Sequence, residues 1–438
     1  MPSVRSAYDR EILRLALPAL GALLAQPLYV LADTAVVGHL GTEELAGLAV
    51  ASTVLLSGYA MFIFLAYGTT AAVARLLGAG DQVRAAHQAV QAMWLGVAIG
   101  VGLAAVGLVL AEPLVGVMGA TGAVRENALI YLRISLLGVP GTMVVLAGTG
   151  YLRGLQDTRT TLLVAVGTAI GNLVLEVVLV FGLGFGIGAS ALSTVAAEYA
   201  AAAVYVGWVL RAVAHHETPL RPDAAAIAAL ARVSRDLFVR TAALRGSLTV
   251  STAVAARIGT VDLAAYQIAF EIWSFLALAL DAIAIAAQAM IGRLLGAGAA
   301  DAARAAARRM IEWGLAAGVL FAVGVIALRP VLPQIFTDDP EVIALTAFLL
   351  LFVAALQPPN AVVFVLDGVL IGAGDMRFLA WAMLGAGVVF VPAAALVLVL
   401  DLGIGWLWGA IALLMAARLL PLAVRYAGDR WVVTGAST

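Results

Sequence analysis

Long apolar runs, separated by short polar stretches, recur along the whole chain. Only helices and closed barrels satisfy the backbone inside a lipid bilayer, and a spanning helix needs about 20 apolar residues. Ala- and Gly-rich runs also suit close helix packing in a membrane. The pattern predicts twelve membrane-spanning helices, at residues 12–36, 45–72, 88–111, 125–149, 160–182, 186–211, 230–256, 262–291, 309–329, 341–370, 377–401 and 403–426.

The composition supports this interpretation. Of the 438 residues, 63% are hydrophobic and only 12% are charged, whereas a soluble domain is about half apolar and about a quarter charged. We therefore expect an all-α polytopic membrane protein. The sequence has no cysteine, which excludes disulfides and thiolate metal sites. A formal net charge of -1 gives no reason to expect a nucleic-acid partner.

The arginines indicate an orientation. With these spans, most loop arginines lie on the side that holds both termini, and only Arg125, Arg257 and Arg329 lie on the other. Because positive residues concentrate on the cytoplasmic side, we expect both termini in the cytoplasm. Every basic residue other than histidine is arginine, and alanine is abundant, as in proteins from GC-rich bacterial genomes. We expect a multi-pass protein of the bacterial plasma (inner) membrane.

The chain also repeats itself. Residues 75–80, Arg-Leu-Leu-Gly-Ala-Gly, recur at 293–298, an offset of 293 − 75 = 218. Gly41-Thr42 and the pattern Gly-x-x-Asp-x-Arg at 154–159 recur at the same offset. Six spans separate equivalent points, so the repeat predicts two six-helix bundles of the same topology: an N-terminal lobe (1–211), a cytoplasmic linker (212–229) and a C-terminal lobe (230–438). Parallel repeats of this kind build transporters that rock around a central cavity.

One acid, Asp33, lies inside the first apolar run. A charge in the bilayer is costly, so such residues normally face a cavity and serve a function. Gln26, Tyr29 and Asp33 follow a spacing of i, i+3 and i+7, which places them on one helix face. Pro18 and Pro27 each remove a backbone hydrogen bond and allow this helix to bend.

Further polar residues follow helical spacing in the fourth to sixth spans. Asn172 and Glu176 are one turn apart, as are Thr194 and Glu198, and Tyr131 lies in the fourth span. These residues could converge with Asp33 in one pocket of the N-terminal lobe. Alternatively, each is separately satisfied by a neighbouring helix, which is the preferred interpretation for Thr194 and Tyr131 taken alone.

The repeat does not extend to this polar set. At the offset of 218, Asp33 corresponds to Ser251, Asn172 to Phe390 and Glu176 to Ala394. The candidate pocket is therefore expected only in the N-terminal lobe.

Three motifs together resemble the multidrug and toxic compound extrusion (MATE) family, in particular its DinF-like branch. They are the first-span run at 31–41, the repeated Arg-Leu-Leu-Gly-Ala-Gly, and the fifth-span run at 172–176 followed by Phe-Gly-Leu-Gly at 181–184. The resemblance covers nearly the whole chain. It implies two six-helix lobes and cation-coupled export of organic compounds. It also implies a helix bend at Pro18 and an N-lobe site formed by Asp33, Tyr131, Asn172, Glu176 and Thr194, where Glu176 replaces the family's usual aspartate.

The C-terminal lobe carries its own charges within apolar runs. Asp367 loosely matches a tenth-span acid that serves the ion in the sodium-coupled branch of the family. Arg245 lies in the seventh span. Because buried charges are normally paired, we expect a structural Arg245–Asp367 ion pair in preference to a sodium site. The sequence leaves undecided the roles of Glu198, Glu271, Asp281 and Arg133.

Taken together, these observations predict a secondary antiporter that exports organic, cationic or amphipathic compounds in exchange for protons. Asp33 would hold the substrate when deprotonated and release it when protonated, since burial disfavours the charged form of a carboxylate. A sodium-coupled multidrug exporter and a flippase for a lipid-linked precursor are the alternatives.

We expect no enzymatic activity, no metal and no cofactor beyond the ion gradient. The four histidines lack metal-binding spacing, and the chain has no nucleotide-binding P-loop. The expected partners are a small organic substrate and membrane lipid, without nucleic acid, and the chain should work as a monomer.

Overall fold

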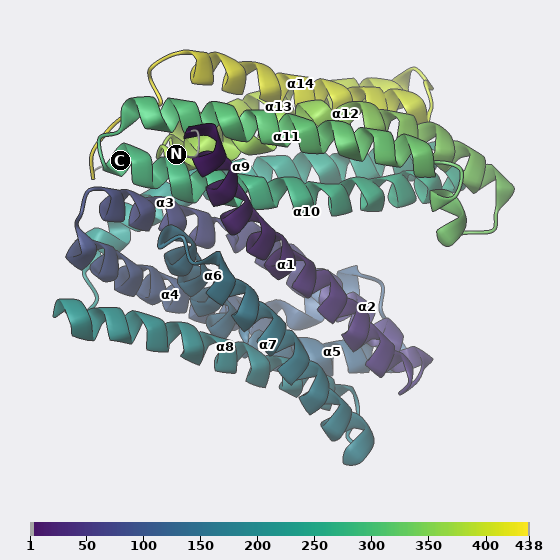
Figure 1. Cartoon of the computed structure of the whole chain (residues 1–438). Coiled ribbons are helices and arrows are strands. Elements are labelled where there is room, and N and C mark those ends of the chain that lie inside the picture. The colour runs from purple at the N-terminus through teal and green to yellow at the C-terminus, as the bar shows by residue number, and fades with distance from the viewer. Residues whose placement is uncertain (1–3, 437–438) are drawn as a thin grey trace. The chain divides into compact units, whose positions relative to one another are not determined.

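The structure, a computed structural model, describes residues 4–436 and is built from helices, with no strand among those residues (Figure 1). This confirms the expected all-α class. In the first half the helices are α1 (Val4–Gly38), α2 (Thr42–Phe62), α3 (Phe64–Gly78), α4 (Gln82–Val117), α5 (Gly122–Leu136), α6 (Val139–Gly154), α7 (Thr158–Val177), the π-helical turn η1 (Val178–Gly182) and α8 (Ile187–His216). In the second half they are α9 (Ala224–Ile258), α10 (Thr260–Gly296), α11 (Ala300–Leu328), the 3-10 turn η2 (Leu332–Ile335), α12 (Pro340–Gly372), α13 (Met376–Val399) and α14 (Ile404–Ala427).

Eleven of the twelve expected spans are matched by apolar helices. Within the described residues, ten helices are long and apolar enough to cross a membrane, and α5 with α6, bent by 48°, makes an eleventh. The exception is the expected span 230–256, which lies within α9. Its 35 residues are long enough, but its arginines, Arg240 and Arg245 among them, and its serines and threonines make it more polar than the other spans.

The repeat appears in the helix boundaries themselves. The pair α2–α3 covers 42–78 and α10 covers 260–296, so both ends differ by 218 (260 − 42 and 296 − 78). Gly80 and Gly298, also 218 apart, follow these helices with φ of 78° and 75°, left-handed values that favour glycine. The two halves therefore share one topology. They differ in continuity, because the first half has breaks between α2 and α3 and between α5 and α6.

Contacts divide the chain into two compact units. The N-unit is Leu17–Ser234, and the C-unit combines the chain through Ala16 with the chain from Arg235 onward. The two cuts are again 218 residues apart (234 − 16). Both α1 and α9 are divided, so each begins in one unit and continues in the other. The expected lobes, 1–211 and 230–438, instead keep α1 whole in the N-terminal lobe, and their bounds fall inside α8, which ends at His216, and inside α9, which begins at Ala224. The non-helical connection within the expected linker is 217–223.

Candidate functional site

The Asp33 carboxylate of α1 lies in a buried polar cluster of the N-unit and is 5% exposed. Its Oδ1 accepts a hydrogen bond from the Ser190 hydroxyl of α8 at 2.7 Å. Its Oδ2 accepts one from the Tyr131 hydroxyl of α5 at 3.3 Å. Two hydroxyl groups from two other helices therefore face the acid.

An amide–hydroxyl network continues the cluster. Tyr29 and Thr194 share a hydrogen bond of 2.7 Å between their hydroxyl oxygens. The Asn172 amide of α7 donates to both oxygens, at 3.0 and 3.2 Å. Its own carbonyl oxygen accepts from the Ser193 hydroxyl at 3.0 Å. The network ties α1, α7 and α8 together around Asn172.

Glu176 is the second acid of the cluster, and its side chain is fully buried. It lies close enough to the Asp33 carboxylate and the Ser190 hydroxyl to interact with both. These contacts are looser than hydrogen bonds, because neither Glu176 carboxylate oxygen has a hydrogen-bond partner among the described residues. Two neighbouring buried carboxylates repel each other unless a proton or a cation lies between them. The arrangement suits exchange of a cation.

The structure brings together five of the residues singled out in the sequence: Asp33, Tyr131, Asn172, Glu176 and Thr194. Tyr131 and Thr194 are part of the cluster and not separately satisfied, as these contacts show. Gln26, which was also expected at the site, is exposed and lies outside the hydrogen bonds described above.

Sequence reasoning missed Ser190 and Ser193, which are both fully buried. A signal for them exists, because Ser190 lies one turn before Thr194 on α8. Glu198 continues this line of residues and lies beside Thr142 of α6.

The backbone is irregular next to the cluster. Two residues after Glu176, at Val178, α7 passes into the π-helical turn η1, and such turns are frequent at functional sites. Pro18 lies inside α1, two residues after the cut between the C-unit and the N-unit. The predicted helix bend would thus lie where α1 passes from one unit to the other.

Three of the equivalent positions in the C-unit are apolar and packed. Leu349, Phe390 and Ala394, which are 218 residues after Tyr131, Asn172 and Glu176, are all fully buried in its core. Ser251, the equivalent of Asp33, accepts a hydrogen bond from Tyr266 at 2.9 Å. The same place in the repeated fold therefore holds packed apolar side chains in the C-unit and polar side chains in the N-unit.

The expected Arg245–Asp367 pair is wrong in its basic partner. Asp367 Oδ2 instead accepts hydrogen bonds from Arg240 of α9 and, at 2.7 Å, from Arg418 of α14. Arg245 is exposed because it lies five positions beyond Arg240, which turns it about 140° around the helix. Arg418 was missed, although it is an isolated charge in the last apolar run.

This buried trio, Arg240, Asp367 and Arg418, carries a formal charge of +1 (two arginines against one acid). Both guanidinium groups donate to the same Asp367 oxygen, Oδ2, so the negative charge of this carboxylate is paired within the trio. Among the described residues, no group of three or more His, Asp or Glu side chains could hold a metal ion.

The chain is similar to known proteins over most of its length. Residues 18–178 and 238–396 both match the MatE family model. The chain is 35% identical over 431 residues to Protein DETOXIFICATION 44, chloroplastic, of Arabidopsis thaliana, covering 95% of this chain and 81% of that protein. It is 30% identical to DNA damage-inducible protein F of Escherichia coli (strain K12), covering 95% and 92%. A crystal structure of MATE in the bent conformation matches with a TM-score of 0.87 at 22% identity, covering 97% of this chain and 96% of that one.

Proposed function

Because the chain belongs to the MatE family and is a multidrug and toxic compound efflux transporter, not an enzyme, we propose that it is a proton-coupled antiporter for organic, cationic or amphipathic compounds. The observation that carries the proposal is the buried pair of carboxylates, Asp33 and Glu176, in the N-unit. A cluster with two acids and no neighbouring arginine among its described contacts can hold either protons or a cationic substrate.

In the proposed cycle, Asp33 is deprotonated when the site opens to the cytoplasm and helps to hold the substrate cation. The hydroxyl groups of Ser190 and Tyr131 stabilise that charge by donating hydrogen bonds to it. When the site opens outward, protonation of Asp33 removes the charge and lowers the affinity for the cation. Bending of α1 near Pro18 would accompany this change.

Proton coupling fits the geometry better than sodium coupling does. Sodium prefers a cage of several oxygens, whereas a proton needs only one carboxylate, and the Asp33 carboxylate already accepts two hydrogen bonds here. The Asn172 carbonyl oxygen, a potential sodium ligand, already accepts from Ser193. A single proton between Asp33 and Glu176 would relieve the repulsion between the two acids without any further ligand.

The remaining parts of the proposal concern the setting of the protein. We place it in the bacterial plasma membrane with both termini in the cytoplasm, since most loop arginines then lie inside. It would work there as a monomer, without a cofactor other than the proton gradient.

Transport driven by imposed gradients tests the coupling ion. Purified protein is reconstituted into liposomes, and uptake of a fluorescent organic cation is followed with a pH gradient at equal sodium, then with a sodium gradient at equal pH. We expect uptake to follow the pH gradient and to stop when a protonophore collapses it. Uptake that persists without the pH gradient and follows sodium instead would overturn the proton mechanism.

A further inference from the structure

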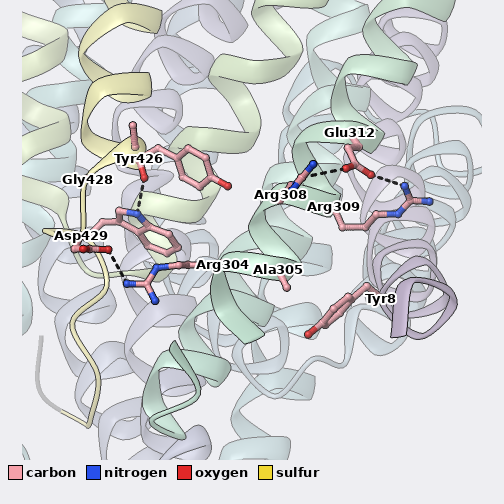
Figure 2. A pocket seen from close by; sticks show the side chains of 11 residues that line it. Tyr8, Arg304, Ala305, Arg308, Arg309, Glu312, Tyr426, Gly428 and Asp429 are labelled. Carbon is pink, nitrogen blue, oxygen red and sulfur yellow. Dashed lines mark hydrogen bonds and ion pairs between the residues drawn. The ribbon is translucent and has the colours of Figure 1, made fainter. Parts of the chain in front are cut away.

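A second polar site belongs to the C-unit. It is a pocket of about 530 Å³ where α11 begins, α14 ends and α1 begins (Figure 2). Its lining combines three arginines of α11, three aromatic residues and two acids: Arg304, Arg308, Arg309, Tyr8, Tyr426, Trp431, Glu312 and Asp429. Arginine and aromatic side chains at the ends of spanning helices are typical of the headgroup level of a bilayer.

The chain after α14 folds back to form one wall of the pocket. Trp431 is 2% exposed, donates a hydrogen bond to the Tyr426 carbonyl oxygen at 3.0 Å, and stacks on the Tyr426 ring with centroids 5.7 Å apart. The Gly435 amide donates to the Leu295 carbonyl oxygen at 3.0 Å. These contacts fix the wall, so the pocket does not depend on a loose terminus.

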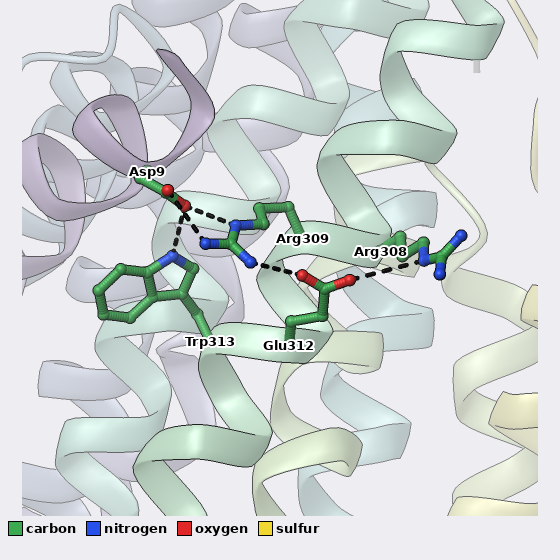
Figure 3. Close-up of polar contacts among 5 residues, drawn as sticks. All are labelled: Asp9, Arg308, Arg309, Glu312 and Trp313. Atoms are coloured by element: carbon green, nitrogen blue, oxygen red, sulfur yellow. Dashed lines mark hydrogen bonds and ion pairs between the residues drawn. The ribbon is translucent and has the colours of Figure 1, made fainter. Parts of the chain in front are cut away.

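Arg304 and Arg309 are already neutralised by acids. Arg304 contacts Asp301 at 3.1 Å and Asp429 at 2.7 Å. Arg309 contacts Asp9 of α1 at 2.6 Å and Glu312 at 2.5 Å, as Figure 3 shows.

Arg308 differs from both. Its contact with Glu312, at 3.6 Å, is longer than a hydrogen bond, and its side chain is 77% exposed. The Glu312 carboxylate already accepts a hydrogen bond from Arg309. Arg308 is therefore the arginine of this pocket that can offer hydrogen bonds and charge to a ligand.

Hydroxyl groups complete the set of donors. Figure 2 shows the hydroxyl end of Tyr426 turned toward Arg308, and the charge of Arg308 acts on that hydroxyl. Tyr8 contributes a second phenol, which donates a long hydrogen bond to the Ala302 carbonyl oxygen at 3.5 Å. A guanidinium and two phenols bind an anion with several oxygens, such as a phosphate.

The surface beside the pocket indicates where the phosphate comes from. Leu315, Val319, Val323 and Ile326 are all exposed and form a stripe along α11 that starts two turns after Arg308. This part of α11 is a candidate membrane span. Acyl chains would lie along the stripe while their phosphate reaches the pocket. We propose that the pocket binds the phosphate of an anionic membrane lipid.

The equivalent part of the N-unit does not repeat this pocket and instead holds the 217–223 connection. Val90 replaces Arg308 there (308 − 218). Gln91 and Trp94, the equivalents of Arg309 and Glu312, donate hydrogen bonds to the carbonyl oxygens of Arg221 and Leu220 in the 217–223 connection. The lipid site is thus a property of the C-unit alone.

Titration of the full-length protein in neutral detergent, followed by native mass spectrometry, tests the proposal. The probes are dioctanoyl phosphatidylglycerol, dioctanoyl phosphatidylcholine and inorganic phosphate. The variants are Arg308→Gln and Tyr426→Phe. The matched control is Arg84→Gln, because Arg84 is 65% exposed and paired with an acid three residues before it, at 3.4 Å, on the N-unit.

We expect wild type and Arg84→Gln to bind phosphatidylglycerol more tightly than phosphatidylcholine. Arg308→Gln should weaken phosphatidylglycerol about fivefold, the effect of one basic residue near a membrane surface, and Tyr426→Phe should weaken it less. Equal binding of the two lipids, or an unchanged preference in Arg308→Gln, would overturn the site. If inorganic phosphate binds this pocket as tightly as phosphatidylglycerol does, the ligand is a free anion and the lipid assignment is wrong.

Discussion

The buried trio of the C-unit gives a quantitative prediction. Asp367 is 6% exposed and Arg418 is 3% exposed, and the Arg240 side chain is 12% exposed. Replacing Asp367 by Asn changes the local formal charge from +1 to +2 and leaves two guanidinium groups facing each other. Removing one partner of a buried ion pair costs on the order of 3–5 kcal/mol, which lowers the folding equilibrium constant by roughly two to nearly four orders of magnitude.

The assay is unfolding of the purified protein in detergent, with Asp301→Asn as the control. Asp301 also pairs with an arginine, but its side chain is fully exposed, so we expect no measurable loss of stability. Adding Arg418→Met to Asp367→Asn should recover part of the loss because it removes one of the two unpaired charges. The reasoning fails if Asp367→Asn is as stable as Asp301→Asn, or if the double variant is no more stable than Asp367→Asn alone.

Three further predictions concern the polar cluster and its apolar counterpart. Asp33→Asn should reach the membrane in normal amounts yet lose export driven by a pH gradient, and wild-type transport by this variant would contradict its role. Cysteines at positions 33 and 176 should be joined by a short crosslinker, whereas cysteines at 26 and 176 should not, because position 26 lies about 10 Å further along α1. Phe390→Ala should cost about 3–5 kcal/mol of stability by opening a cavity, measured by unfolding in detergent. Asn172→Ala, at the equivalent position, should instead reduce transport more than stability, and the opposite ranking would refute this division of roles.

The fold and much of the site could be predicted because the membrane makes polar residues conspicuous. An acid in an apolar run, such as Asp33 or Glu176, stands out since burying its charge is costly. The offset of 218 between the halves further showed that the position equivalent to Asn172 is occupied by an apolar residue, Phe390.

What could not be predicted was which side chains meet. Helical spacing fixes the face of a residue only relative to its own helix, so the sequence could not show that Arg240, and not the expected Arg245, faces Asp367. Ser190 was missed because serine costs little to bury in a helix, where it bonds to its own backbone. The expected span at 230–256 also overlooked the polar residues of α9, which distinguish this helix from the other spans.

The division of α1 and α9 bears on how such a chain could have arisen. Each helix starts in one unit and continues in the other, and the two cuts fall at equivalent residues, Ala16 and Ser234. Two identical six-helix chains that exchanged their first sixteen residues would form an arm-swapped homodimer, a low-cost route to association. Duplication and fusion of the gene, with 217–223 as the join, would produce the arrangement seen here. It follows that a fragment ending at residue 211 would lack the start of α9, which belongs to the N-unit. The start of its α1, with Asp9, would in turn lack Arg309 and Trp313, which bind Asp9 in the full chain.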